Sequence, residues 1–159
     1  MKNASKQDDP ELQIRTVALR LLARREHSRL ELATKLRQRR LPSGLIEAVL
    51  DEFEGEGWLS DERYADVYAR QRMDAGYGPV RIRSELQQRG IRFLPESLTA
   101  VENADWAERA VRLRERRFGL QALGQDWKEK ARQARFLTQR GFAAEHVERA
   151  LEITTPDDG

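Results

Sequence analysis

The feature that most limits how this chain can fold is a short pattern that occurs three times at nearly constant spacing. The pattern is Leu-x-Gln-Arg, then Arg or Gly, then an apolar residue, and its copies begin at Leu36, Leu86 and Leu137. The copies are 50 and 51 residues apart (86 − 36 and 137 − 86). A period of this length indicates tandem units that are each too small to bury a full core and that share apolar surface with their neighbours.

Each repeat has the composition of a helical unit. Glu, Arg, Ala, Leu and Gln are abundant and β-branched residues are few, which favours helices. No segment of the sequence favours a strand. Apolar spacing and turn residues together predict nine helices. They lie near residues 12–25, 29–40, 43–56, 60–75, 79–89, 95–102, 105–118, 126–139 and 143–152.

Several helix starts can be located from their capping residues. Ser60 is expected to cap the fourth helix, because acids follow it at the first two helical positions. Three further starts have the spacing of a capping box, in which two residues bond each other's backbone. These are Ser28 with Glu31, Asp105 with Glu108, and Asp126 with Glu129.

The repeated pattern also contains a helix stop. Gly90 and Gly141 are expected to end the second helix of their repeats, because glycine readily adopts a left-handed conformation. The apolar residue that follows each glycine should then pack back onto the repeat. Arg40 occupies the glycine position in the first repeat. The second helix of that repeat is therefore expected to end with a different local geometry.

These observations predict an all-α protein, an elongated tandem array of three three-helix repeats. The repeats are assigned to residues 12–57, 58–103 and 104–153, with disordered tails at 1–11 and 154–159. In the seventh helix Ala107, Ala110, Val111 and Phe118 share the expected core face. Arg109, Arg112 and Arg116 form a stripe on the opposite face, where they should face solvent and be available to a partner.

The residues and motifs that most enzymes need are missing from the sequence. The chain has no cysteine, and it contains neither a phosphate-binding glycine loop nor a nucleophile elbow. His27 and His146 are far apart, have no histidine partner four residues away, and are each expected to be polar surface or edge residues. We therefore predict a protein that is not an enzyme and that uses no cofactor, metal ion or small-molecule substrate.

The apolar stretches are too short for membrane insertion. None exceeds a few residues, and the first ten residues lack the apolar core of a signal peptide. The expected location is the cytoplasm.

The net charge of +2 conceals strong segregation along the chain. Residues 12–40 contain nine Lys or Arg and two acids, a net +7, whereas residues 41–62 contain seven acids and no base, a net −7. Residues 109–117 return to a net +4, with five bases and one acid. A single block of this kind is equally consistent with a solvated helix face. The recurrence of such charged blocks along the chain favours a charged macromolecular partner.

Four segments in a fixed order carry a resemblance to a known family. The most specific is Gly-Tyr-Gly-Pro-Val-Arg-Ile at residues 76–82, followed by Gln-Arg-Gly-Ile at 88–91. The others lie at residues 18–36, 57–65 and 116–142. In order and spacing, residues 14–152 resemble the RecX family, bacterial regulators of the RecA recombinase.

The resemblance implies a function in DNA repair, recombination and the SOS response. It implies a protein that binds the RecA–DNA filament along its groove and blocks filament extension or promotes disassembly. The ATPase, strand-exchange and coprotease activities of RecA would then fall. The resemblance also agrees with the three-helix repeats. We further expect a monomer, with DNA bound only weakly and without sequence preference.

Partner contacts are expected from nine residues in two groups, each of which could instead be solvated or paired within the molecule. The first group is Arg24, Arg25, Lys35, Arg37, Arg39 and Arg40, and the second is Tyr77, Arg81 and Arg83. Tyr77 has a further alternative, a rigid turn with Pro79 that opens the fifth helix. Two other functions stay open: a helical DNA-binding protein that acts on DNA directly, and a helical adaptor for an unrelated protein.

Overall fold

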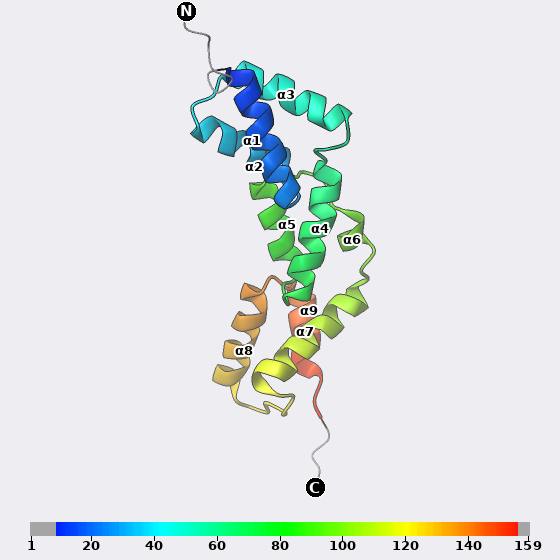
Figure 1. The fold of residues 1–159 in the computed structure, drawn as a ribbon. Coiled ribbons are helices and arrows are strands. Elements are labelled where there is room, and N and C mark those ends of the chain that lie inside the picture. The colour runs from blue at the N-terminus through cyan, green and yellow to red at the C-terminus, as the bar shows by residue number, and fades with distance from the viewer. Residues whose placement is uncertain (1–8, 156–159) are drawn as a thin grey trace, which may run out of the picture. The chain divides into compact units, whose positions relative to one another are not determined.

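A computed structural model describes residues 9–155, which form nine α-helices and no strand (Figure 1). Of the tails that were expected to be disordered, residues 1–8 and 156–159 lie outside this described range. The helices are α1 (Pro10–Arg24), α2 (Arg29–Gln38), α3 (Ser43–Gly55), α4 (Asp61–Asp74), α5 (Pro79–Gln88), α6 (Glu96–Thr99), α7 (Asn103–Phe118), α8 (Trp127–Gln139) and α9 (Ala144–Glu152). No helix in this part of the chain is both long and apolar enough to cross a membrane.

Most predicted helix starts are confirmed. Ser28 Oγ accepts the Glu31 amide at 3.1 Å while Glu31 returns a bond to the Ser28 amide, so the capping box is complete. Ser60 Oγ accepts the amide of Arg63, also at 3.1 Å. The capping box predicted at Asp105 is wrong. Helix α7 begins at Asn103 after an extended Glu102, which places Asp105 inside the first turn.

The last predicted box is only half formed. Asp126 accepts the Glu129 amide at 3.1 Å, but the Glu129 carboxylate binds the side chains of Arg132 and Gln133. The start of α1 was placed too late, because Asp9 caps the helix and Pro10 takes its first position. Helix α6 is a single turn, shorter than the expected 95–102.

The chain divides into two compact units. The first contains the described residues up to Val67 together with Leu86–Phe93. Within it α1, α2 and α3 pack on one another around an apolar core. Its fully buried side chains include Ile14, Leu32, Leu36, Ile46, Leu50 and Phe53.

The second unit contains Tyr68–Glu85 together with the described residues from Leu94 onward. Here α7, α8 and α9 pack together, and the contact between α7 and α9 is the most extensive. Its buried apolar residues are Ala69, Ile82, Leu98, Trp106, Ala110, Leu113, Leu137, Phe142, Val147 and Ala150. Helices α4 and α5 each contribute residues to both units, which divides the middle repeat between them.

Helix α7 buries a different face from the one predicted, and that face includes an arginine. Its buried residues are Trp106, Ala110, Leu113 and Arg114, whereas Ala107, Val111 and Phe118 are only half-buried. The Arg114 guanidinium donates to Gln133 Oε1 at 2.8 Å, and to the carbonyl oxygens of Ile153 at 2.7 Å, Gln121 at 3.0 Å and Ala150 at 3.1 Å. Burial lowers the pKa of Arg114. The side chain still holds α8, α9 and the loop after α7 together.

Replacing Arg114 with Met should therefore destabilise the protein by about 3 kcal/mol, because several buried carbonyl oxygens lose their donor. Urea unfolding followed by circular dichroism measures this difference. Arg116→Met, at an exposed position on the same helix without an acid or hydrogen-bond partner among the described residues, is the matched control and should change stability little. Equal stabilities for the two variants would contradict the role given to Arg114.

All three copies of the repeated pattern place a left-handed residue after their second helix. Gly90 and Gly141 have φ of 82° and 98°, and Arg40 has φ of 60°. The amides of Ile91 and Phe142 then donate to the carbonyls of Leu86 and Leu137, but the equivalent bond from Leu41 to Leu36 does not form in the described chain. The different geometry predicted for the first repeat is thus confirmed for this closing bond and wrong for the backbone conformation of Arg40. Arg40 is the one non-glycine residue with positive φ in the described chain.

A second observation explains why an arginine is tolerated only in the first repeat. A Cβ on Gly90 would lie 2.9 Å from Leu30 Cβ, and a Cβ on Gly141 would overlap Arg81. Leu30 and Arg81 stand near the start of the second helix of the preceding repeat. Each glycine is thus pressed against the repeat before it. Arg40 has no preceding repeat, and its side chain is exposed.

This difference predicts opposite responses at equivalent positions. Arg40→Gly should stabilise the protein by up to about 1 kcal/mol, because the left-handed strain disappears and is only partly offset by entropy of the unfolded chain. Gly141→Ala should destabilise it by at least about 2 kcal/mol, because strain and overlap act together. Thermal unfolding of both variants measures the contrast. If Arg40→Gly destabilises the protein instead, the Arg40 side chain makes a stabilising contact that outweighs the strain of its backbone.

Candidate partner-binding surfaces

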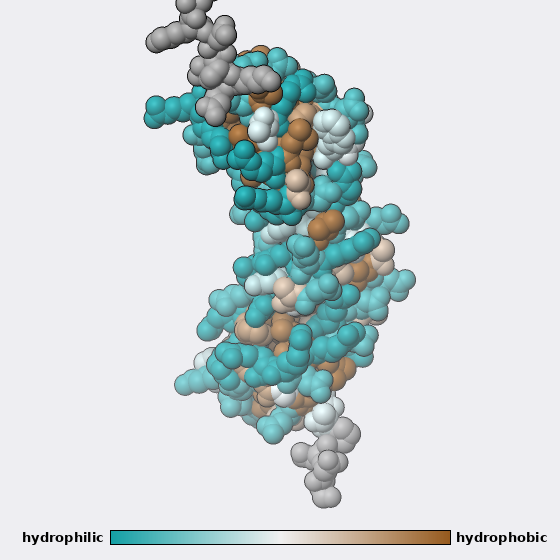
Figure 2. Space-filling view, viewed as in Figure 1, coloured by the Kyte–Doolittle hydropathy of each residue, from teal (hydrophilic) through white to brown (hydrophobic). Residues whose placement is uncertain are grey.

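Hydrophilic side chains predominate on the face drawn in Figure 2, where apolar residues form only small patches. Among the described residues, no group of three or more His, Cys, Asp or Glu is placed to hold a metal ion. Both histidines are buried, with exposed fractions of 1% for His27 and 4% for His146, so the prediction that they lie at the surface is wrong. The charged side chains are therefore the candidates for contact with a partner.

Of the six basic residues predicted as contacts in the first unit, three are engaged inside it. Arg25 donates to both carboxylate oxygens of Glu31, and Arg37 pairs with Glu47 at 2.9 Å. Lys35 Nζ lies 3.0 Å from His27 Nε2. The guanidinium groups of Arg24, Arg39 and Arg40 are exposed and bond no side chain or backbone group of the described chain. These three are available to a partner.

The sequence prediction missed Arg29, which neutralises much of the acidic third helix. Its guanidinium pairs with Glu47 at 2.7 Å, Asp51 at 2.8 Å and Glu54 at 3.0 Å. Burial opposes the charge, but the hydrogen bonds that Arg29 donates to these three carboxylates raise its pKa. The negative block at residues 41–62 is thus partly compensated by a residue from the basic block. A pattern of charge along the chain does not reveal this pairing.

His27 holds the connection between α1 and α2. Its Nδ1–H donates to the Arg25 carbonyl at 3.1 Å, which leaves Nε2 to accept from Lys35. Burial lowers the pKa of His27, and the Arg25 and Lys35 charges act in the same direction, while the Arg25 carbonyl and Glu31 oppose them. The neutral imidazole is therefore the form that fits the folded protein.

A pH dependence follows from this lowered pKa. The unfolded chain binds a proton near pH 6.5 while the folded protein stays neutral, so stability should fall as pH decreases below about 6.5. His27→Gln should abolish this decline, which urea unfolding between neutral and mildly acidic pH can measure. The loss of stability caused by protonation of Glu31 occurs at lower pH. Burial raises the pKa of Glu31, but hydrogen bonds from Arg25 and from the Ser28 amide lower it further. An unchanged pH profile in His27→Gln would contradict this role.

In the second unit, Tyr77 lies at the centre of an arginine cluster. The guanidinium carbons of Arg72, Arg81 and Arg140 lie 3.8, 4.5 and 4.9 Å from the centre of its ring. Such contacts between a cation and an aromatic ring are favourable. Glu85 accepts from Arg72 at 2.7 Å and from Arg81 at 3.1 Å, so it compensates part of this charge. Tyr77 and Arg81 are thus brought together, as the sequence prediction grouped them.

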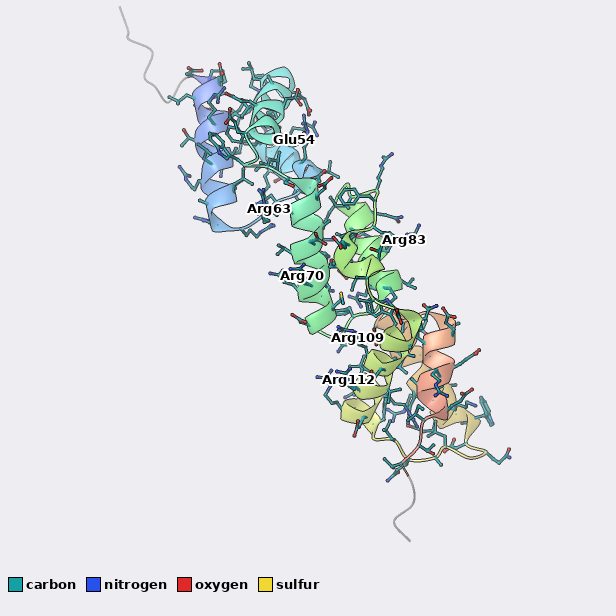
Figure 3. The ribbon with its side chains drawn as sticks, turned by 90° about the vertical axis from the view of Figure 1, so that its right-hand side faces the viewer. Glu54, Arg63, Arg70, Arg83, Arg109 and Arg112 are labelled. Carbon is teal, nitrogen blue, oxygen red and sulfur yellow. The ribbon has the colours of Figure 1, made fainter. Side chains whose placement is uncertain are left out.

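Arg83 differs from its two predicted companions. It is exposed, and it makes no hydrogen bond or ion pair with the residues that the structure describes. In Figure 3 it projects from α5 away from the side on which Arg70 leaves α4. Arg81, by contrast, also donates to the Gln139 carbonyl at 3.1 Å. Arg83 is therefore the free member of the group, while Tyr77 and Arg81 organise the surrounding structure.

The arginine stripe predicted on α7 lines a pocket of about 190 Å³. Arg109, Arg112 and Arg116 form one wall, and Asp74, Gly76 and Tyr77 from the end of α4 contribute to the other. Arg112 has an exposed ion pair with Glu108 at 3.2 Å. Arg109 and Arg116 have no acid or hydrogen-bond partner among the described residues. Figure 3 shows Arg109 and Arg112 projecting together from α7.

These features define a class: an all-helical protein of three-helix repeats whose surfaces carry unpaired arginines. Comparison with known families makes the assignment specific. Residues 15–53 match the first three-helix domain of RecX, residues 60–92 the second, and residues 104–151 the third. The chain belongs to the RecX family.

Whole-chain relatives agree with these domain matches. The chain is 46% identical to the regulatory protein RecX of Halorhodospira halophila over 147 residues, which cover 91% of this chain and 90% of that protein. It is 47% identical to the regulatory protein RecX of Pseudomonas entomophila over 145 residues, covering 90% and 92%.

The fold is also that of a solved relative. The crystal structure of RecX from Lactobacillus salivarius superposes with a TM-score of 0.76, at 20% identity, over 91% of this chain and 96% of that one.

Proposed function

We propose that this protein binds the RecA–DNA filament and inhibits the ATPase, strand-exchange and coprotease activities of RecA, by blocking filament extension or promoting disassembly. It would act in the cytoplasm as a non-enzymatic regulator of DNA repair, recombination and the SOS response. The observation that carries the proposal is membership of the RecX family across all three domains, with relatives named as regulatory proteins.

The distribution of unpaired charge supports a polymeric partner. Arg24, Arg39 and Arg40 in the first unit and Arg83 in the second are exposed cations without an acid partner in the described chain. Each exposed contact contributes at most about 1 kcal/mol. Several such contacts along a repeating partner add up without a deep pocket, because the second contact forms at high effective concentration. Binding of this kind weakens as salt increases.

The nine predicted contact residues divide into two roles in this proposal. Arg24, Arg39, Arg40 and Arg83 would touch the filament. Arg25, Lys35, Arg37, Tyr77 and Arg81 would hold the surfaces in shape, because their polar groups or rings are engaged within the molecule. Reversing the charge of Arg81 would place an acid beside Glu85 and damage the Tyr77 cluster. Arg83 alone is the cleaner test.

The decisive measurement is titration of the protein into a RecA ATPase assay with single-stranded DNA. The wild-type protein should inhibit, and Arg83→Glu should raise the half-inhibiting concentration by about fivefold, because an attractive contact is lost. Arg135→Glu, at an exposed position on α8, is the matched control and should leave inhibition unchanged.

Two outcomes would contradict the proposal. If the ATPase rate of RecA does not change when the wild-type protein is added, the proposal loses its basis. Tight, sequence-selective binding to DNA alone in a gel-shift assay would favour the alternative, a helical protein that acts on DNA directly.

A further inference from the structure

The surroundings of Tyr77 concentrate positive charge in the second unit. Three guanidinium groups surround its ring, those of Arg72, Arg81 and Arg140. The adjoining pocket, which Tyr77 also lines, adds Arg109, Arg112 and Arg116. Tyr77 therefore lies between three arginines that surround its ring and three others that line the adjoining pocket. Such a cluster is unfavourable by itself, because like charges repel at short range.

Few acids compensate this cluster. Glu85 pairs with Arg72 and Arg81, Glu108 pairs with Arg112, and Asp74 lines the pocket. Six positive and three negative charges leave an excess of +3 within the described residues. The excess lies on the α7 wall, where Arg109 and Arg116 have no carboxylate partner. An anionic ligand would supply the missing charge.

The geometry of α7 indicates what kind of anion fits. Arg109, Arg112 and Arg116 recur at intervals of three and four residues and extend over about 10 Å of helix, at about 1.5 Å per residue. In duplex DNA one strand carries a phosphate about every 3.4 Å along the helix axis, and a single strand can extend further. The row of arginines is therefore long enough to contact more than one phosphate of the same strand. Guanidinium groups bind phosphate oxygens through paired hydrogen bonds.

We propose that this pocket, formed by Arg109, Arg112 and Arg116 of α7 and closed by Gly76 and Tyr77, is a phosphate-binding site for the backbone of single-stranded DNA. The inference rests on the proposed function only for the source of that DNA, the strand held in the RecA filament. The ring of Tyr77 is already occupied by guanidinium groups, so it positions charge and does not stack on a base. The site therefore reads no sequence.

The test measures binding of the full-length protein to a fluorescent oligothymidylate by anisotropy over a range of salt. In one variant Arg109, Arg112 and Arg116 are all replaced by Gln. The slope of log K against log salt should become shallower by about 2, since each lost phosphate contact contributes about 0.7. Affinity near 0.1 M salt should fall by about tenfold or more.

The control removes equal charge elsewhere in the same unit. Arg70, Lys130 and Arg135, all exposed, outside the pocket and without an acid partner among the described residues, are replaced by Gln. The control should keep most of the affinity and slope of the wild type. Circular dichroism tests whether both variants fold, and Arg116→Gln alone, with a slope change of about 0.7, replaces the triple variant if that does not fold.

The outcomes separate this inference from the proposed function. Equal losses in the two triple variants would overturn it, because net charge alone would then explain DNA binding. Unchanged DNA binding with lost inhibition of the RecA ATPase would also overturn it, and would assign the pocket to acidic groups of the protein partner. A loss specific to the pocket, in a protein that never inhibits RecA, would leave the site standing and refute the proposed function.

Discussion

The close approach of a helix end to the repeat before it is the contact on which the repeated architecture depends. In the second unit the Gly78 amide donates to the Arg140 carbonyl at 2.8 Å, and the Val80 amide donates to the Gly141 carbonyl at 2.9 Å. The amides of Gly78, just before α5, and of Val80, in its first turn, have no partner within that helix and thus donate to carbonyls just beyond the end of α8. Only a glycine leaves room for this approach, because any Cβ at position 141 would meet Arg81.

This contact also explains the pattern from which the repeats were recognised. The Leu-x-Gln-Arg-Gly pattern includes a buried leucine, a left-handed stop and an apolar residue that turns back, and Leu86 with Ile91 and Leu137 with Phe142 are all buried. The backbone bond that follows is the same in both copies, from Ile91 to Leu86 and from Phe142 to Leu137. The sequence pattern therefore records a local helix stop and a contact between repeats together. In the first repeat, which has no repeat before it, Arg40 provides the helix stop without the contact between repeats.

The fold could be predicted from the sequence to a large extent because its determinants are local. Helical spacing, caps such as Ser28 and stops such as Gly141 act within a few residues, and they located the helix ends to within two residues except at α6, which ends three residues earlier than predicted. What could not be predicted depends on partners distant in the chain. In the sequence, Arg114 cannot be distinguished from a surface arginine. It can be buried in the core because it donates hydrogen bonds to the carbonyls of Gln121, Ala150 and Ile153.

The candidate contact residues likewise differ in whether the sequence alone could identify them. The α7 stripe was predictable, because arginines at i, i+3 and i+7 lie on one face whatever surrounds them. The pairing of Arg25 with Glu31 and of Lys35 with His27 required the folded chain. Near Tyr77 the folded chain pairs Arg72 and Arg81 with Glu85, whereas Arg109 and Arg116 on the α7 wall of the adjoining pocket have no carboxylate partner among the described residues. The sequence therefore shows the α7 stripe, but only the folded chain shows which arginines stay unpaired and which residues complete the pocket that they line.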